Sequence, residues 1–61
     1  MTIQEAIKSG KVFGQEGDEF EYKMDGIWLY YREVMLKKEW TPDHEGFSLD
    51  EILADDWEIK E

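Results

Sequence analysis

The stretch FEYKMDGIWLYY, Phe20 to Tyr31, decides the fold of this chain. Large apolar residues alternate with charged ones from Phe20 to Met24, as in a strand with one buried face, and a second apolar run ends at Tyr31. Asp25-Gly26 between them is typical of a two-residue type I′ turn, whose central positions both need a positive φ. We therefore predict an antiparallel hairpin with Asp25-Gly26 at its tip.

A two-residue turn fixes which residues of a hairpin lie opposite each other. This turn would place Phe20 opposite Tyr31, and the buried face would then consist of Phe20, Tyr22, Met24, Ile27, Leu29 and Tyr31. The other face would pair Lys23 with Trp28, Glu21 with Tyr30, and Glu19 with Arg32.

Capping boxes predict a short helix near each end of the sequence. Thr2 and Glu5 open the first, which runs from Ile3 to Lys8 before a left-handed Gly10. Ser48 and Glu51 open the second, whose apolar residues Leu49, Ile52 and Leu53 share one side.

The segment after the second helix alternates as a final strand, with Trp57 and Ile59 on one face. We expect these two residues to complete the core beneath the apolar side of the second helix. Phe47, just before the Ser48 cap, is in position to pack on Ile52 as a hydrophobic staple.

The remaining segments give weaker patterns. Lys11 to Phe13 is predicted to be extended, and Gln15 to Asp18 and Thr41 to Gly46 are predicted loops. Val34 to Leu36 fits either an extension of the second strand or a third strand. The sequence thus predicts one domain, residues 1–61, with an α+β fold: a single small antiparallel sheet around the Phe20–Tyr31 hairpin with two short helices.

Acidic residues dominate the composition. The chain has 16 acidic and 7 basic residues, a net charge of −9, and the part after Pro42 carries −7 of it, from eight acids and Lys60. Such a charge repels nucleic acid and anionic membranes and attracts basic surfaces, although it also serves solubility alone. We expect no direct binding of nucleic acid or membrane. No membrane-length apolar run or signal peptide is visible, which predicts a cytoplasmic protein.

The sequence contains few residues that are suited to catalysis. The chain has no cysteine, and its single histidine, His44, lies in an acidic loop. Ser9 and Ser48 read as helix-end residues, and Asp55-Asp56 is more typical of a solvated helix end than of a metal site. We predict no enzyme activity, no metal and no cofactor.

Trp28 and Tyr30 lie on the polar face of the predicted hairpin and allow two interpretations. Either a helix or the final strand covers them, or they form an exposed aromatic pair of the kind that anchors protein interfaces.

Two stretches resemble a known family. The opening MTIQEAIKSGK and the ending SLDEILADDWEI, about 23 residues together, are similar to the two ends of small phage proteins in the Thoeris anti-defence protein 2-like group. The resemblance implies a phage protein that opposes bacterial immunity in the host cytoplasm. Some relatives sequester cyclic nucleotide signals as oligomers, and others are anti-CRISPR proteins.

The chain departs from that family after the opening helix, where a basic and aromatic stretch is usual. Here Phe13 to Phe20 is acidic, which is unsuited to a phosphorylated ligand. We therefore expect an anti-defence inhibitor that binds a basic surface of a host defence protein, such as a CRISPR-type nuclease, as an acidic nucleic-acid mimic. Sequestration of a cyclic nucleotide is the alternative, and a homo-oligomer stays open. The candidate partner-binding residues are Asp50, Glu51, Asp55, Asp56, Glu58, Trp28 and Tyr30.

Overall fold

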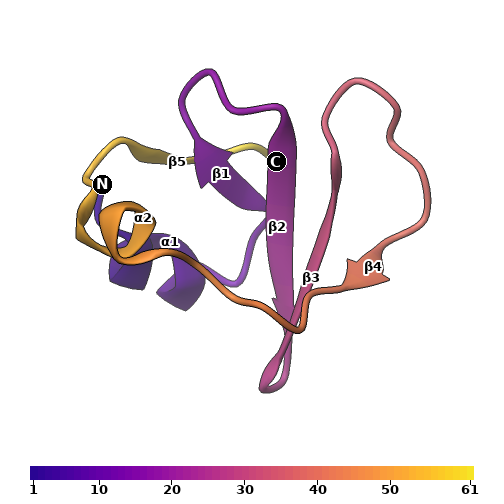
Figure 1. The fold of residues 1–61 in the computed structure, drawn as a ribbon, viewed down its shortest axis with the longest axis horizontal. Coiled ribbons are helices and arrows are strands. Elements are labelled where there is room, and N and C mark those ends of the chain that lie inside the picture. The colour runs from indigo at the N-terminus through magenta and orange to yellow at the C-terminus, as the bar shows by residue number, and fades with distance from the viewer.

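The computed structural model describes residues 1–61 as one antiparallel five-stranded sheet with two short helices, a small α+β fold (Figure 1). This confirms the predicted fold class. The elements are α1 (Ile3–Lys8), β1 (Phe13–Gln15), β2 (Phe20–Asp25), β3 (Trp28–Glu33), β4 (Thr41–Pro42), α2 (Leu49–Leu53) and β5 (Trp57–Ile59). The strand order is β4-β3-β2-β1-β5, so the first four strands follow one another across the sheet and β5 returns beside β1.

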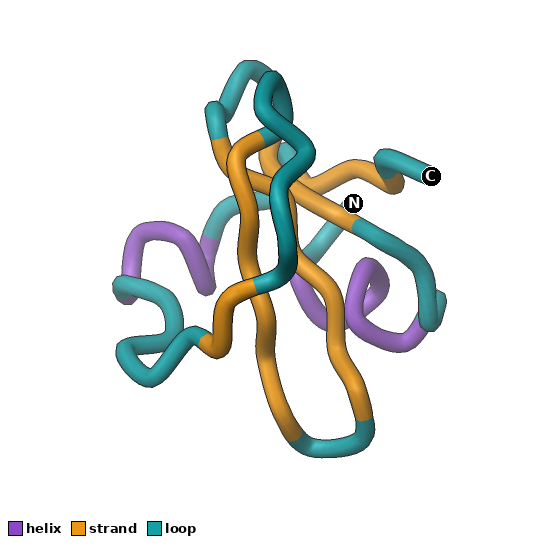
Figure 2. The backbone as a smooth tube through the Cα atoms, turned by 90° about the vertical axis from the view of Figure 1, so that its right-hand side faces the viewer, coloured by secondary structure: helices purple, strands orange, loops and turns teal.

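The β2–β3 hairpin forms as predicted, but its turn lies one residue further along the chain. Asp25 pairs with Trp28, Tyr22 with Tyr31, and Gly26-Ile27 forms the turn. Only Gly26 has a positive φ there, +63°, whereas the predicted turn would have required one at Asp25 as well. Asp25 therefore stays extended and pairs with Trp28, and the turn projects at the free end of the molecule (Figure 2).

The change of register is two residues, so each side chain keeps its predicted face. Phe20, Tyr22, Met24, Leu29 and Tyr31 share the inner face, on which Tyr22 is buried and the others are half-buried. Ile27 is the exception, because it lies in the turn and is 84% exposed.

Both helices begin at the predicted capping boxes. In α1 the Glu5 amide donates to Thr2 Oγ1 over 3.3 Å, and Glu5 Oε1 accepts from the Thr2 amide over 3.0 Å. The hydrogen bonds from Thr2 hold the pKa of the Glu5 carboxyl below its usual value. Gly10 follows α1 with φ +72°. Ser48 and Glu51 repeat the capping box at α2.

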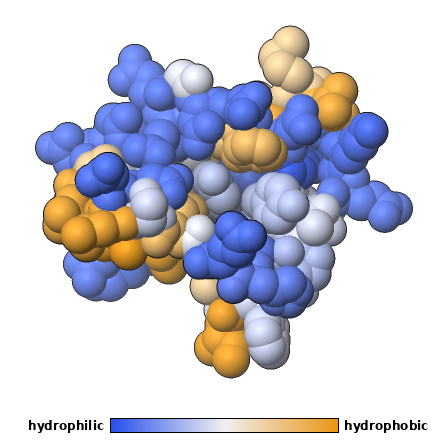
Figure 3. All heavy atoms as spheres, in the orientation of Figure 1, coloured by the Kyte–Doolittle hydropathy of each residue, from blue (hydrophilic) through white to orange (hydrophobic).

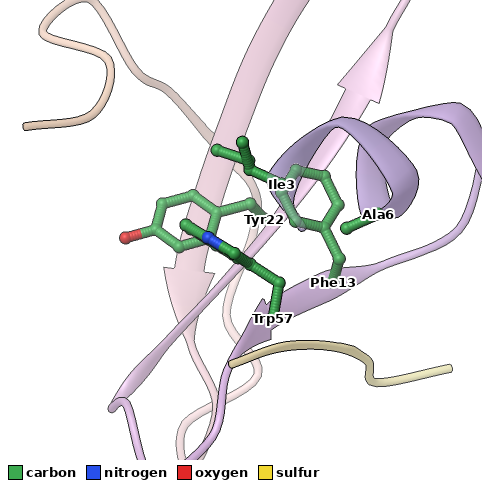
Figure 4. Close-up of a cluster of buried hydrophobic side chains, with 5 residues drawn as sticks. All are labelled: Ile3, Ala6, Phe13, Tyr22 and Trp57. Carbon is green, nitrogen blue, oxygen red and sulfur yellow. The ribbon is translucent and has the colours of Figure 1, made fainter. Parts of the chain in front are cut away.

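The core lies where α1, β1, β2 and β5 meet, and consists of Ile3, Ala6, Phe13, Tyr22 and Trp57 (Figure 4). The ring centroids of Phe13 and Trp57 are 5.8 Å apart, and Trp57 is 1% exposed. Its indole Nε1 donates to the Glu51 carbonyl over 2.9 Å, which attaches α2 to the core. The predicted roles of Trp57 and Ile59 are confirmed, since Ile59 packs against this cluster.

The predicted burial of the apolar side of α2 is wrong. Leu49, Ile52 and Leu53 are 69%, 48% and 73% exposed. The space above the sheet is taken by the ring of Phe47, whose centroid lies 4.9 Å from that of Tyr22 and 5.3 Å from that of Trp57. Phe47 therefore serves the core, where the sequence predicted a staple on Ile52.

The chain between β3 and α2 also differs from expectation. Residues 34–36 form a turn, so Val34 to Leu36 contributes no strand of its own. The third strand of this part of the sheet is the two-residue β4, which lies inside the predicted Thr41–Gly46 loop. It pairs with β3, with Thr41 opposite Tyr31.

Candidate functional site

Three exposed aspartates lie close to one another along the chain, on α2 and in the turn that follows it. Asp50 is in the first turn of the helix, and Asp55 and Asp56 precede β5. None of the three takes part in an ion pair; Asp56 only accepts a hydrogen bond from Gln15 Nε2 over 2.9 Å. Glu51 is half-buried, and its carboxylate is engaged in the capping box with Ser48. The carboxylates of Asp50, Asp55 and Asp56 thus have no ion-pair partner, although the Met1 ammonium group donates to the Asp55 carbonyl oxygen over 2.9 Å.

The exposed apolar residues of α2 lie among these carboxylates. In Figure 3 a hydrophobic patch covers the position of α2 and is bordered by hydrophilic atoms. We call the group the α2 surface, which consists of Leu49, Asp50, Ile52, Leu53, Asp55 and Asp56. An apolar centre with a charged border is the usual anatomy of a protein interface.

The other candidate residues lie elsewhere. Glu58 sits between Trp57 and Ile59 in β5, so it faces away from the core, and its Oε1 is 2.7 Å from Lys60 Nζ. Trp28, 63% exposed, and the half-buried Tyr30 lie on the outer face of β3. Trp28 is covered neither by a helix nor by β5, which lies beside β1, and this contradicts the first interpretation for that residue. The structure thus separates the aromatic pair and Glu58 from the α2 surface.

A buried carboxylate that the sequence did not reveal organises the outer face of the sheet. Glu21 is 0% exposed, and its Oε2 lies 2.7 Å from Arg32 Nε. Lys37 Nζ approaches its Oε1 within 3.2 Å, and Glu61 contacts both bases. Glu21 and Glu61 are therefore neutralised by bases of the same chain.

Trp40 adds to the same face. Arg32 Cζ lies 4.2 Å from its ring centroid and Lys23 Nζ lies 4.9 Å from it, so two cations flank one indole. The correct hairpin register would have revealed part of this group, because it places Glu21 opposite Arg32 and opposite charges favour such cross-strand pairs.

A cavity of about 370 Å³ opens on the inner face beside the core. Phe20, Tyr22 and Tyr31 contribute aromatic side chains, and the loop Asp43–Gly46 forms the opposite wall. Burial, and then the nearby carboxylates of Asp18, Glu51 and Asp43, raise the pKa of Tyr22 to about 12. His44, the single histidine, is exposed on this wall.

Neither helix has the length and apolar character needed to cross a membrane. Side chains of His, Asp and Glu nowhere gather in a group of three or more that could hold a metal ion. Comparison of the chain with protein-family models, with curated proteins and with solved structures finds no match.

Proposed function

We propose that this protein is a phage anti-defence protein that inhibits a host immune factor by binding it stoichiometrically, with the α2 surface against a basic region of the target. The observation that carries the proposal is that the exposed carboxylates of Asp50, Asp55 and Asp56 have no ion-pair partner and lie around exposed apolar side chains. The resemblance of both chain ends to phage anti-defence proteins supports the biological setting.

The distribution of ion pairs favours binding over mere solubility. Every ion pair of the chain involves Arg32, Lys37 or Lys60, and the acids that they neutralise are Glu21, Glu58 and Glu61. If the acids served solubility alone, only their net charge would matter. The exposed apolar side chains of α2 beside the unpaired acids would then have no purpose. A basic surface that normally holds nucleic acid fits both features, because carboxylates can pair with the arginines and lysines that bind phosphates.

The test is a plaque assay on bacteria that carry a defence system, with the protein expressed before infection. The variant Asp50→Lys, Asp55→Lys and Asp56→Lys should lose its ability to restore plaques. A matched control, Asp25→Lys, Glu33→Lys and Glu39→Lys, makes the same change in net charge at exposed positions outside the α2 surface and should retain it. Circular dichroism checks that both variants fold.

Purified target and inhibitor should also form a complex that weakens as salt rises, because the Debye length falls from about 10 Å at 0.1 M to about 3 Å at 1 M. Duplex DNA should compete for the same site if the protein mimics nucleic acid. Equal activity of the α2-surface variant and the wild-type protein would refute the proposal.

Sequestration of a cyclic nucleotide is the competing function. Asp43 and Glu45 in the wall of the inner-face cavity oppose an anionic ligand there. Calorimetric titration with cyclic ADP-ribose isomers and cyclic oligonucleotides decides between the two. Micromolar binding of any of them would replace stoichiometric inhibition as the leading proposal.

A further inference from the structure

We propose that the inner-face cavity is a receptor for a single arginine side chain of the protein partner. The proposal adds a binding site to the function proposed above, and it rests on that function because the arginine would belong to the host target. The cavity itself can be tested without that partner.

The aromatic side of the cavity suits a planar cation. Phe20 and Tyr31 meet edge to face with centroids 5.8 Å apart, and both are half-buried. Aromatic faces attract guanidinium groups, which are weakly hydrated and stack on rings more readily than ammonium groups. A volume of about 370 Å³ is within the usual range for sites that hold a small ligand.

The Tyr22 hydroxyl is a second feature that suits a polar ligand. Tyr22 is 8% exposed and lines the cavity, and none of the side-chain hydrogen bonds of the chain involves its hydroxyl. No buried side-chain oxygen of the chain lacks a hydrogen-bond partner, so this unpaired hydroxyl is accessible from the cavity. A guanidinium N–H in the cavity could donate to this oxygen.

The opposite wall supplies negative charge from a shaped loop. Asp43 Oδ1 accepts from the amides of Glu45 and Gly46, each over 3.0 Å, and the Asp43 amide donates to the Leu29 carbonyl over 2.9 Å. Gly46 has φ +74°, which closes the loop. The wall is thereby held in place before a ligand arrives. Neither Asp43 nor Glu45 is in an ion pair, so both carboxylates can face an incoming cation.

The cavity and the α2 surface lie close enough to contact one partner. Phe47 joins them, since its ring packs on Tyr22 and it precedes the Ser48 cap of α2. Glu51, in α2, is also near enough to influence the pKa of Tyr22. One arginine in the cavity and a basic region on the α2 surface can therefore come from a single bound protein.

The experiment uses the full chain and three short peptides that differ at one position: arginine, lysine or citrulline between glycine and serine residues. Binding is followed by changes in the NMR signals of the Tyr22 and Tyr31 rings and of the amides of residues 43–46. Citrulline keeps the shape of arginine without its charge. The arginine peptide should bind at least about tenfold more tightly than either of the other two.

Two variants locate the binding. Glu45→Gln removes a carboxylate of the wall and Tyr31→Leu removes a ring, and each should weaken the arginine peptide severalfold. The control Glu39→Gln removes an exposed carboxylate outside this cavity and should leave binding unchanged. Equal affinity for the citrulline or lysine peptide, or for the Glu45 and Tyr31 variants, would overturn the arginine receptor.

The outcome is independent of the plaque assay. Selective arginine binding together with an inert α2 surface would support the cavity and refute the proposed function. If the α2-surface variant loses inhibition but the cavity shows no selective arginine binding, the proposed function is supported and the arginine receptor is refuted.

Discussion

Replacement of Glu21 by alanine should bring this small protein close to unfolding. The carboxylate is fully buried and pairs with Arg32, whose side chain is 15% exposed, so its removal leaves a cation with little access to water. Loss of one partner from a buried pair costs about 3–5 kcal/mol. Lys37 adds little to the loss, because its side chain is 48% exposed and solvent screens it.

This loss is large compared with the stability available. At about 0.05–0.15 kcal/mol per residue, a chain of 61 residues has a free energy of unfolding of roughly 3–9 kcal/mol. A loss of 3 kcal/mol lowers the Tm by at least about 12 °C at this size. Urea unfolding followed by tryptophan fluorescence measures the change. Glu33→Ala, at an exposed position of β3, is the matched control and should cost less than about 0.5 kcal/mol.

A double variant separates the ion pair from simple loss of packing. Glu21→Leu with Arg32→Leu removes both charges, so it should be more stable than Glu21→Leu alone, with a coupling energy of about 1–3 kcal/mol. If Glu21→Ala costs no more than Glu33→Ala, or if the double variant shows no coupling, Glu21 is not the buried partner of Arg32 and this reasoning fails.

Three further perturbations test other parts of the fold. Trp57→Ala empties a site that is 1% exposed and should cost about 3–5 kcal/mol in urea unfolding, whereas Trp28→Ala, at a 63% exposed site, should cost under about 1 kcal/mol. Gly14→Ala places a Cβ 3.0 Å from the Phe20 carbonyl oxygen and should cost about 1–3 kcal/mol; a neutral effect on the Tm would refute this close approach. The raised pKa of Tyr22, about 12 against about 10 in the unfolded chain, adds stability that is fully present below pH 10 and is lost as the pH rises through 12. Tyr22→Phe should remove this alkaline loss, as alkaline unfolding curves and the tyrosinate absorbance of the wild-type protein would show.

The sequence correctly predicted the structural features that depend only on residues close together in the chain, namely the helix starts and the faces of the hairpin strands. Each capping box spans four positions, and both helices begin where the boxes indicated. Alternation in the hairpin likewise assigned every strand residue to its face. These features follow from backbone geometry within a few residues, so no knowledge of distant contacts was needed.

Features that depend on distant contacts were missed. The turn has two acceptable two-residue forms, and Asp25 stays extended because the Gly26-Ile27 form needs only one left-handed residue. The burial of Glu21 depends on that register and on Lys37, which reaches it from another segment while Glu61 contacts the same two bases. For α2, a short apolar stripe could not reveal that Phe47 already fills the space above the core.

The candidate site was predictable only in its local part. Asp50, Asp55 and Asp56 are exposed, as expected for a polar helix start and turn. Glu58 could have been assigned to the other side of the sheet, since residues in a strand alternate and Trp57 faces the core. The cavity was not foreseen, because it needs the Asp43–Gly46 loop to lie across from β2 and β3.

The two faces of the sheet differ in a way that bears on how a partner would approach. On the outer face, Glu21, Glu58 and Glu61 are matched by Arg32, Lys37 and Lys60, so a charged partner there would compete with existing pairs. The carboxylates of the inner-face cavity and of α2 take part in no ion pair. A basic protein that approaches from that side breaks no ion pair between side chains and can also cover the apolar side chains of α2. An approach from the outer face would offer Trp28 as an anchor but would have to break ion pairs elsewhere on that face. The balance of contacts therefore favours association through the α2 surface and the neighbouring cavity.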